Sequence, residues 1–260
     1  MQRAFSLVEL SIVLVILGLL TGGILAGQSL IRASELRAVT TEYQRYITAT
    51  QTFRDKYFAL PGDMNNATRF WGDDNAACAD AGIPNGSPGT CNGNGDGIMT
   101  ANGGGGVTGE WYQYWKQLAL AGLIEGSYTG LSGSAAAEHL SNVNAPASKL
   151  GNAMWGLWYT DASFAGSGGD YAIDFGNVLL FGTQAAASYP NTAALRPEEA
   201  WNIDTKLDDG KPAQGKIIAG RWNNACSAAD DGTHANNDLV ASYKLTDSTI
   251  QCLLRFRKAF

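Results

Sequence analysis

A short glycine-rich stretch, NGNGDGIMT, has the side-chain chemistry of a calcium loop. Asn92, Asn94 and Asp96 stand at alternate positions before Gly97, which is how EF-hand loops space their oxygen ligands and their turn glycine. Where such a loop would have its final bidentate acid, this chain has a glycine. Glu110 from the next helix is the candidate to substitute for it, and Asp73, Asp74 or Asp80 could contribute. The alternative is a plain glycine–asparagine turn that holds no ion.

Arrangements typical of catalysis are scarce in this chain. The two histidines, His139 and His234, stand in no H-E-x-x-H run, and neither G-x-S-x-G nor G-x-x-x-x-G-K-[ST] occurs. We therefore expect both histidines on the surface. The adjacent Asp208 and Asp209 resemble a carboxylate pair, but acids directly before a glycine are typical of a solvated turn. The sequence indicates a protein that is not an enzyme.

The four cysteines form two pairs that are close in sequence, and none has the C-x-x-C spacing of zinc or redox sites. In an exported protein they predict two disulfides. Three pairings are possible. We favour Cys78 with Cys91 and Cys226 with Cys252, because a crossed pairing would need the two ends of the globular region to meet.

The charge pattern offers no specific indication of nucleic-acid binding. The chain has 260 residues and a formal net charge of -6, and its 18 basic residues are scattered rather than gathered in a stripe. Its seven tryptophans could build a sugar-binding surface, but core packing is the favoured interpretation.

A carboxylate stands near the start of a long apolar segment, AFSLVELSIVLVILGLLTGGILAG. From Leu10 to Ala26 the run is about 17 residues, near the lower limit for a helix that spans a bilayer. It therefore predicts a membrane helix. A secretory signal peptide is the alternative, although its apolar region would be shorter and TGGILAGQS is a weak cleavage site. In hydrocarbon, Glu9 would cost several kcal/mol unless it were paired.

Helical periodicity continues past the apolar run as far as ALPGD, where Pro61 and Gly62 should stop it. We expect one helix over residues 5–58, roughly 80 Å long. Its first part, 8–27, suits lipid, and its second part, 28–58, suits a globular domain. The apolar stripe of the second part comprises Leu36, Val39, Tyr43, Tyr46, Ile47, Thr50, Phe53 and Tyr57, and the expected solvent face carries Arg37, Glu42, Arg45 and Lys56.

The rest of the chain, residues 59–260, is expected to form one α+β head. After a long glycine-rich loop, a helix is predicted at 109–126 and another at 196–210, with Pro197 at its first position. The predicted strands form a mostly antiparallel sheet that packs on the stem, and they lie at 154–160, 171–182, 216–222, 238–246 and 249–260.

The first residues resemble the class III leader of type IV pilins and of the pseudopilins of type II secretion systems. The shared features stand at fixed offsets: a short polar leader with Arg3, a small residue at Ala4, then Phe5, and Glu9 before the apolar run. Ala4 departs from the family, in which glycine is usual. ALPGDM, AGLIEGSYTG and NIDTKLDDGKPAQGK also resemble stretches of large-headed proteins with this leader.

The resemblance implies how the chain is processed and assembled. Residues 1–4 would be a leader that a prepilin peptidase removes at the cytoplasmic face of the inner membrane, and Phe5 would be N-methylated. The subunit would then enter a helical filament, with an assembly platform and an outer-membrane secretin as partners. Glu9 would pair with the α-amino group of a neighbouring copy, which neutralises two buried charges and sets the register of the stems. The alternative is an anchor whose Glu9 reaches the headgroups.

We therefore expect a structural subunit of a type IV pilus-like filament. A pseudopilin that pushes exported proteins through a secretin is the alternative within the resemblance. From another class, the alternative is a membrane-anchored protein whose head binds a ligand or sugar and never polymerises. The major pseudopilins also need calcium, but they bind it nearer the C-terminus, so the resemblance transfers no calcium ligand to this chain.

Overall fold

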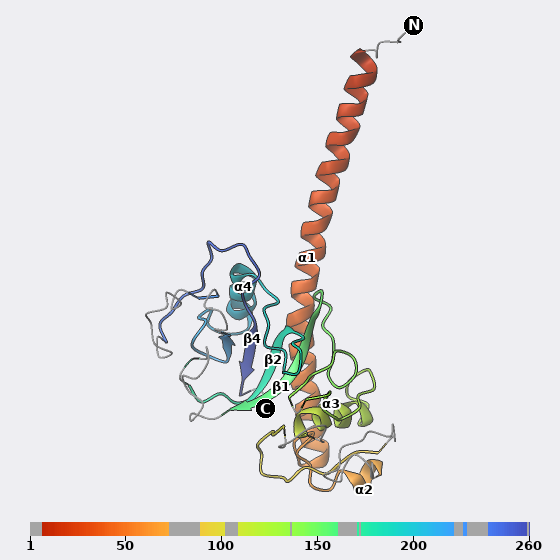
Figure 1. The fold of residues 1–260 in the computed structure, drawn as a ribbon, viewed down its shortest axis with the longest axis vertical. Coiled ribbons are helices and arrows are strands. Elements are labelled where there is room, and N and C mark those ends of the chain that lie inside the picture. Colours follow the sequence, from red (N-terminus) through yellow and green to blue (C-terminus); the bar gives the residue numbers. More distant parts are fainter. Residues whose placement is uncertain are drawn as a thin grey trace.

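The computed structural model describes residues 7–72, 89–101, 109–135, 137–160, 171, 173–220, 226–227, 239–258 and 260. In Figure 1 one long helix enters a head of helices and strands and extends far beyond it toward the N-terminus. The elements in chain order are α1 (Leu7–Tyr57), α2 (Thr68–Trp71), α3 (Glu110–Leu120), β1 (Ala153–Thr160), β2 (Gly176–Thr183), α4 (Pro197–Leu207), β3 (Ile217–Ala219) and β4 (Leu254–Arg257). This is the predicted α+β class.

Helix α1 is unbroken over 51 residues, as predicted. It ends at Tyr57, ahead of Pro61, because Phe58 takes a left-handed φ of 55°. The Phe58 N–H still donates to the Arg54 carbonyl at 2.8 Å, which is the last helical hydrogen bond. A left-handed residue directly after the last turn is a common helix stop, although glycine usually fills it.

The second half of α1 packs its apolar stripe into the head as expected. Tyr46 is 1% exposed and meets Trp115 and Trp155 edge-on, with ring centroids 5.0 and 5.6 Å away. Tyr43 stacks on Phe256 at 4.4 Å. Each buried aromatic ring contributes roughly 1.5–3 kcal/mol relative to an exposed one. This stripe holds the stem in the head.

The expectation that Glu42 lies on the solvent face is wrong. Its side chain is buried, and its Oε2 accepts hydrogen bonds from Ser148 Oγ at 2.7 Å and from Trp155 Nε1 at 2.8 Å. Its Oε1 accepts from the backbone N–H of Lys149 at 2.9 Å. Three donors to the carboxylate offset its desolvation, so a residue type typical of a surface is a buried link between stem and head.

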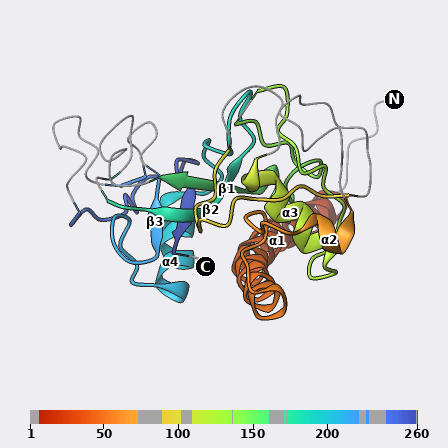
Figure 2. The same cartoon turned by 90° about the horizontal axis from the view of Figure 1, so that it is seen from below.

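The sheet has the strand order β1-β2-β4-β3, and every neighbouring pair is antiparallel. Trp155 of β1 pairs with Phe181 of β2, and both rings lie on the face that meets α1. On the opposite face Trp158 packs against Phe175, with centroids 6.0 Å apart. Figure 2 shows α1 and α4 on the same side of the sheet. The tryptophans of β1 are therefore core residues, as favoured above.

Several predicted boundaries differ from the structure. The helix predicted at 109–126 ends at Leu120, and Gly122 follows with a φ of 71°. The strand predicted at 171–182 begins only at Gly176, and those at 216–222 and 249–260 shorten to β3 and β4. Of the strand predicted at 238–246, the described residues form only an isolated bridge at Tyr243. β2 begins at Gly176 because this residue lies opposite Thr160, the last residue of β1, so the residues before Gly176 have no place in that ladder.

The favoured disulfide between Cys226 and Cys252 is present, with Cα atoms 5.0 Å apart. It joins the segment before the Tyr243 bridge to the residues just before β4. Cys91 is also disulfide-bonded. Its predicted partner, Cys78, lies outside the described residues.

We expect Glu42→Ala to destabilise the head by about 3 kcal/mol, because it leaves three buried donors without an acceptor. Thermal unfolding of the full chain, followed by near-ultraviolet circular dichroism, measures the effect. Glu35→Ala is the matched control, since Glu35 pairs with Arg32 at 3.4 Å in a partly exposed site and should change stability by less than about 1 kcal/mol. Equal midpoints for the two variants would contradict the proposed link.

Candidate functional site

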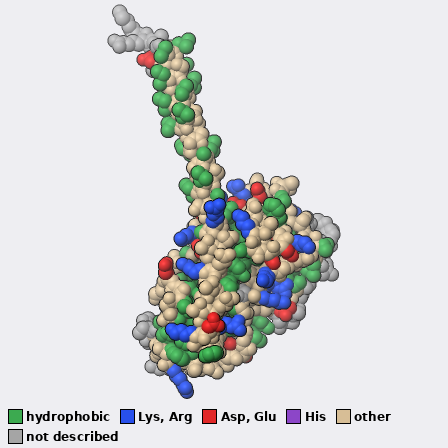
Figure 3. Space-filling view, turned by 180° about the vertical axis from the view of Figure 1, so that it is seen from behind, with side chains coloured by type: hydrophobic (Ala, Val, Ile, Leu, Met, Phe, Trp, Pro, Cys, Tyr) green, Lys and Arg blue, Asp and Glu red, His purple; other side chains and the backbone are tan. Residues whose placement is uncertain are grey.

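The first half of α1, Leu7 to Ala26, makes no packed contact with the described part of the head. Every residue from Leu7 to Ala26 is exposed, and α1 contains an 18-residue window of mean hydropathy 2.4, long and apolar enough to cross a membrane. Figure 3 shows this half as a bare rod covered with hydrophobic side chains. A water-soluble monomer rarely exposes so continuous an apolar surface. The exposed large hydrophobic side chains of α1 up to Ile31 are Leu7, Val8, Leu10, Ile12, Val13, Leu14, Val15, Ile16, Leu17, Leu19, Leu20, Ile24, Leu25, Leu30 and Ile31.

The hydroxyl groups of this half are satisfied within the helix. Ser11 Oγ donates to the Val8 carbonyl at 2.9 Å, and Thr21 Oγ1 donates to the Leu17 carbonyl at 2.9 Å. A helix that satisfies its backbone and its hydroxyls internally needs no water along its length. The bare half of α1 therefore has the chemistry of a membrane-spanning segment.

Glu9 lies in the first turn of α1, with its side chain exposed. An acidic residue is favourable there, because the helix dipole places partial positive charge at the N-terminus. The predicted cleavage residues Ala4 and Phe5 lie outside the described residues. Cleavage, methylation of Phe5 and pairing with Glu9 therefore stay predictions.

The comparison with protein families bears on this same segment. Residues 1–25 match the family model of the prokaryotic N-terminal methylation motif. The chain begins with the class III leader of type IV pilins and pseudopilins. No curated protein and no solved structure matches the chain. Together with the class III leader, the apolar helix fits a precursor anchored in the inner membrane, and it points to a structural subunit rather than an enzyme.

An ion pair joins α1 to α4 just after the apolar part of α1 ends. Arg32 Nε and Nη2 donate to the two carboxylate oxygens of Glu199, each at 2.6 Å. The backbone N–H of Arg196 donates to the same carboxylate at 2.9 Å as part of the capping box of α4. Burial by itself would raise the pKa of Glu199, but these donors hold it below its usual value. Sequence periodicity gave no sign of this pair, which fastens α4 to the stem.

Three of the predicted calcium residues, Asn92, Asn94 and Asp96, lie in one loop, and the last two hold its backbone. Asn94 Oδ1 accepts from the Asp96 N–H at 2.9 Å, and Asp96 Oδ1 accepts from the Ile98 N–H at 2.8 Å. Asn92 turns away to accept from the Thr68 N–H at 2.9 Å. The structure therefore brings Asn94 and Asp96 together and directs Asn92 toward α2. The further candidates Asp73, Asp74 and Asp80 lie outside the described residues.

Two buried carboxylates from outside the loop of residues 92–98, termed the glycine loop, accept hydrogen bonds from the backbone in and next to it. Glu110 accepts from the N–H groups of Asn94 at 3.2 Å and Thr100 at 2.8 Å. Burial raises the pKa of Glu110, and these N–H donors oppose that shift in part. Asp63, which the sequence analysis missed, accepts from the N–H groups of Gly95 at 2.6 Å and Gly97 at 2.8 Å. The spacing of a calcium loop is thus also the spacing of a backbone turn that carboxylates organise.

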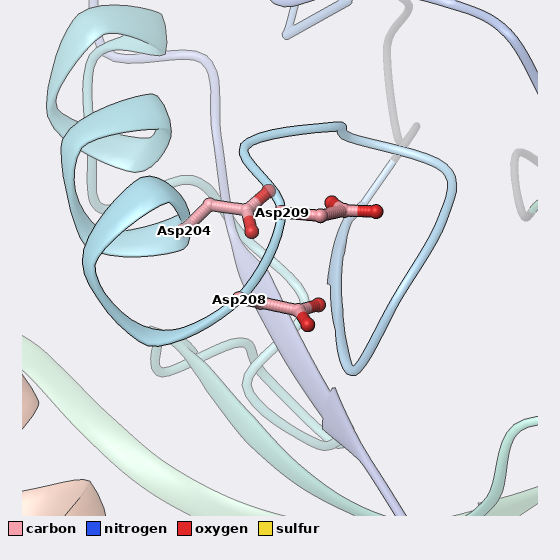
Figure 4. Close-up of side chains that lie close together, drawn as sticks. All are labelled: Asp204, Asp208 and Asp209. Atoms are coloured by element: carbon pink, nitrogen blue, oxygen red, sulfur yellow. The ribbon is translucent and has the colours of Figure 1, made fainter.

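A second acidic group lies at the end of α4. Figure 4 shows the side chains of Asp204, Asp208 and Asp209 close together, and one oxygen of each lies within 4.8 Å of the others. Asp204 is fully buried and accepts from the Tyr243 hydroxyl at 2.7 Å. Burial, with a smaller contribution from the two neighbouring carboxylates, raises the pKa of Asp204 to about 7.

The expectation of a solvated turn holds for Asp209 only. Asp209 is exposed, whereas Asp208 is half-buried and its Oδ2 accepts from the backbone N–H groups of Lys216 and Ile217. Asp208 thereby ties the turn to the start of β3. Three carboxylates at this spacing have the donor atoms of a metal site, and they also perform these structural contacts.

The expectation that His139 lies on the surface is wrong. It is fully buried against the rings of Trp111 and Tyr112, and its Nε2 accepts from the Leu157 N–H at 3.3 Å. Its Nδ1 therefore carries the proton and donates to the Ala137 carbonyl at 3.1 Å. Burial lowers the pKa of His139 to about 4, so it is a neutral core residue. His234 lies outside the described residues.

The buried Asp204 predicts a pH dependence of stability. Its pKa of about 7 in the folded chain lies above the unfolded value of about 3.9, so the native state holds the extra proton between these values. The stability that this proton supplies is present below about pH 4 and is lost as the pH rises through 7, by on the order of 4 kcal/mol. Asp204→Asn should therefore gain stability relative to the parent as the pH rises.

Denaturant midpoints of both proteins at about pH 5, 6, 7 and 8 measure this difference. The exposed Asp209→Asn is the control and should follow the parent closely. Parallel curves for the parent and Asp204→Asn would show that the buried carboxylate does not hold its proton.

Proposed function

We propose that this protein is a structural subunit of a type IV pilus-like filament. It would be inserted in the inner membrane, cleaved between Ala4 and Phe5, N-methylated at Phe5 and polymerised through α1. The observation that carries the proposal is the class III leader, which continues directly into a helix half that the head leaves uncovered.

The physical basis of assembly is the transfer of this apolar surface from lipid to protein. In a filament the bare halves of neighbouring α1 helices would pack on one another. Glu9 and the amino group of Phe5 would supply opposite charges at the start of every helix, and a buried pair of this kind serves register more than stability. The aromatic stripe of the second half is already packed against the head, so it would not take part in contacts between stems. It would hold each head on the outside of the bundle of α1 helices.

The class III leader is common to pilins and pseudopilins, so it supports a pseudopilin of a type II secretion system equally. The two differ in their partner machinery. Filaments on sheared cell surfaces would favour the pilus. Periplasm-limited protein, with secretion lost on deletion, would favour the pseudopilin.

Processing and the role of Glu9 give one prediction. Mass spectrometry of the mature protein should find methylated Phe5 as its first residue. Glu9→Ala should remain in the membrane fraction and assemble poorly, because a neighbour's amino group would lose its partner, whereas Glu35→Ala should assemble normally. Electron microscopy of sheared filaments and immunoblots of membranes measure both.

A mature N-terminus near Gly27 or Gln28 would restore the signal-peptide interpretation. Normal polymerisation of Glu9→Ala would contradict the proposed pairing. Mature protein that starts at Phe5 but never leaves the membrane would favour the non-polymerising anchor.

Calcium binding by the glycine loop is a separate proposal. Its support is that Asn94 and Asp96 supply hard oxygen atoms within one loop and that Glu110, the first residue of α3, contacts the same loop. Asn92, the fourth predicted ligand, would have to turn back from α2 to join them. Isothermal titration calorimetry of the full chain with calcium should show binding at or below about 1 mM that Asp96→Ala removes. The control is Asp174→Ala, outside this loop. Absence of binding, or equal binding by Asp96→Ala, would leave the loop a plain turn.

A further inference from the structure

The head has a cavity that is lined by the last turns of α1. Figure 1 shows that this end of α1 lies in the head, far from the N-terminus. The volume of the cavity is about 720 Å³, within the range of about 300–1,000 Å³ typical of small-molecule sites. The last turns of α1, the chain that follows them and the glycine loop form its walls. The side chains of the lining that could meet a ligand are those of Gln51, Arg54, Asp55, Phe58 and Asn65.

The wall made by the glycine loop is held in place by the buried carboxylate of Asp63. Asp63 is only 4% exposed, and its two carboxylate oxygens accept from the N–H groups of Gly95 and Gly97. Both glycines have positive φ angles, 78° and 82°, which a residue with a side chain rarely adopts. The loop is therefore shaped before any ligand arrives, which reduces the entropic cost of binding.

Phe58 occupies a backbone position at the edge of this cavity that is strained for a residue with a side chain. It is the left-handed residue that ends α1, where glycine or asparagine would be less strained. Its side chain is 93% exposed, whereas the nearby Phe70 packs edge-on against Tyr57 at 5.1 Å. Among the described residues no aromatic ring contacts Phe58. Strain of this kind collects where a side chain has a function, and an exposed ring beside a cavity can serve as a stacking surface.

The polar side chains of the same lining indicate the class of ligand. Arg54 and Asp55 bring one positive and one negative charge, and Gln51 and Asn65 add neutral amides; all four are exposed. The carboxylate of Asp63 is already occupied by the loop. The lining thus has nearly balanced charge, several hydrogen-bonding groups and the apolar side chains of Phe58, Ala59 and Leu60. A charged ligand would find little net attraction, and a purely apolar one would strip water from polar groups without replacing it.

We propose that this cavity binds a neutral carbohydrate, with a C–H face of the sugar against the Phe58 ring and its hydroxyl groups on Arg54, Asp55 and Asn65. Sugars present donors and acceptors around the edge of a ring that has apolar faces, which is the complement of this lining. The site lies in the head and does not depend on polymerisation. It would stand on a monomer in the membrane as well as on a filament.

The test uses the full chain in lipid nanodiscs, because glycosidic detergents would compete. Lactose, maltose and diacetylchitobiose are the neutral probes, and sialyllactose and a heparin disaccharide are the charged ones, each titrated by saturation-transfer NMR. At least one neutral probe should bind, and Phe58→Ala should weaken it about tenfold or more. Phe58→Tyr should keep binding within about threefold. Phe70→Ala, which removes an exposed ring outside the lining, should leave binding unchanged.

Phe58→Gly separates the ring's binding role from a structural one. It should abolish binding while raising the thermal midpoint by about 2 °C, because glycine relieves the positive φ. Binding of charged probes alone, or of none, would overturn the proposal. So would equal losses in Phe58→Ala and Phe70→Ala, or a lower thermal midpoint for Phe58→Gly, since the ring would then serve the fold.

Discussion

The docking of the second half of α1 into the head is the constraint on which the rest of the structure depends. The first half has no apolar partner within the described chain, so the apolar packing that holds the helix lies in its second half, where Tyr43, Tyr46 and their neighbours meet the head. Apolar packing is not directional and would tolerate sliding. Glu42 removes that freedom, because its three donors come from fixed places in the head.

This arrangement gives the two ends of the molecule different environments. The bare half of α1 carries surface suited to lipid or to other copies of the chain, and the Arg32–Glu199 pair fastens it where it leaves the head. The opposite end of α1 is polar and holds the cavity beside Phe58. A subunit anchored by its N-terminus therefore presents that cavity on the side away from the anchor.

Local signals in the sequence predicted elements well wherever the cause is local. Pro197 at the first position of α4 and the unbroken periodicity of α1 depend only on neighbouring residues, and both predictions are confirmed. His139, Glu42 and Asp204 were assigned to the surface or overlooked, and all three are buried. A titratable residue is buried only where partners from distant segments satisfy it, and no spacing rule reveals which segments will meet.

The sequence by itself determined the class III leader, the apolar segment and the length of the helix that joins them, because each is a pattern of residue types at fixed offsets. The α+β class of the head followed from the order of its elements. Only the tertiary structure decided which carboxylates are buried, that Asp63 supports the glycine loop, and that Phe58 borders a cavity. Those facts depend on contacts between residues far apart in the chain, and such contacts exist only once the head has folded.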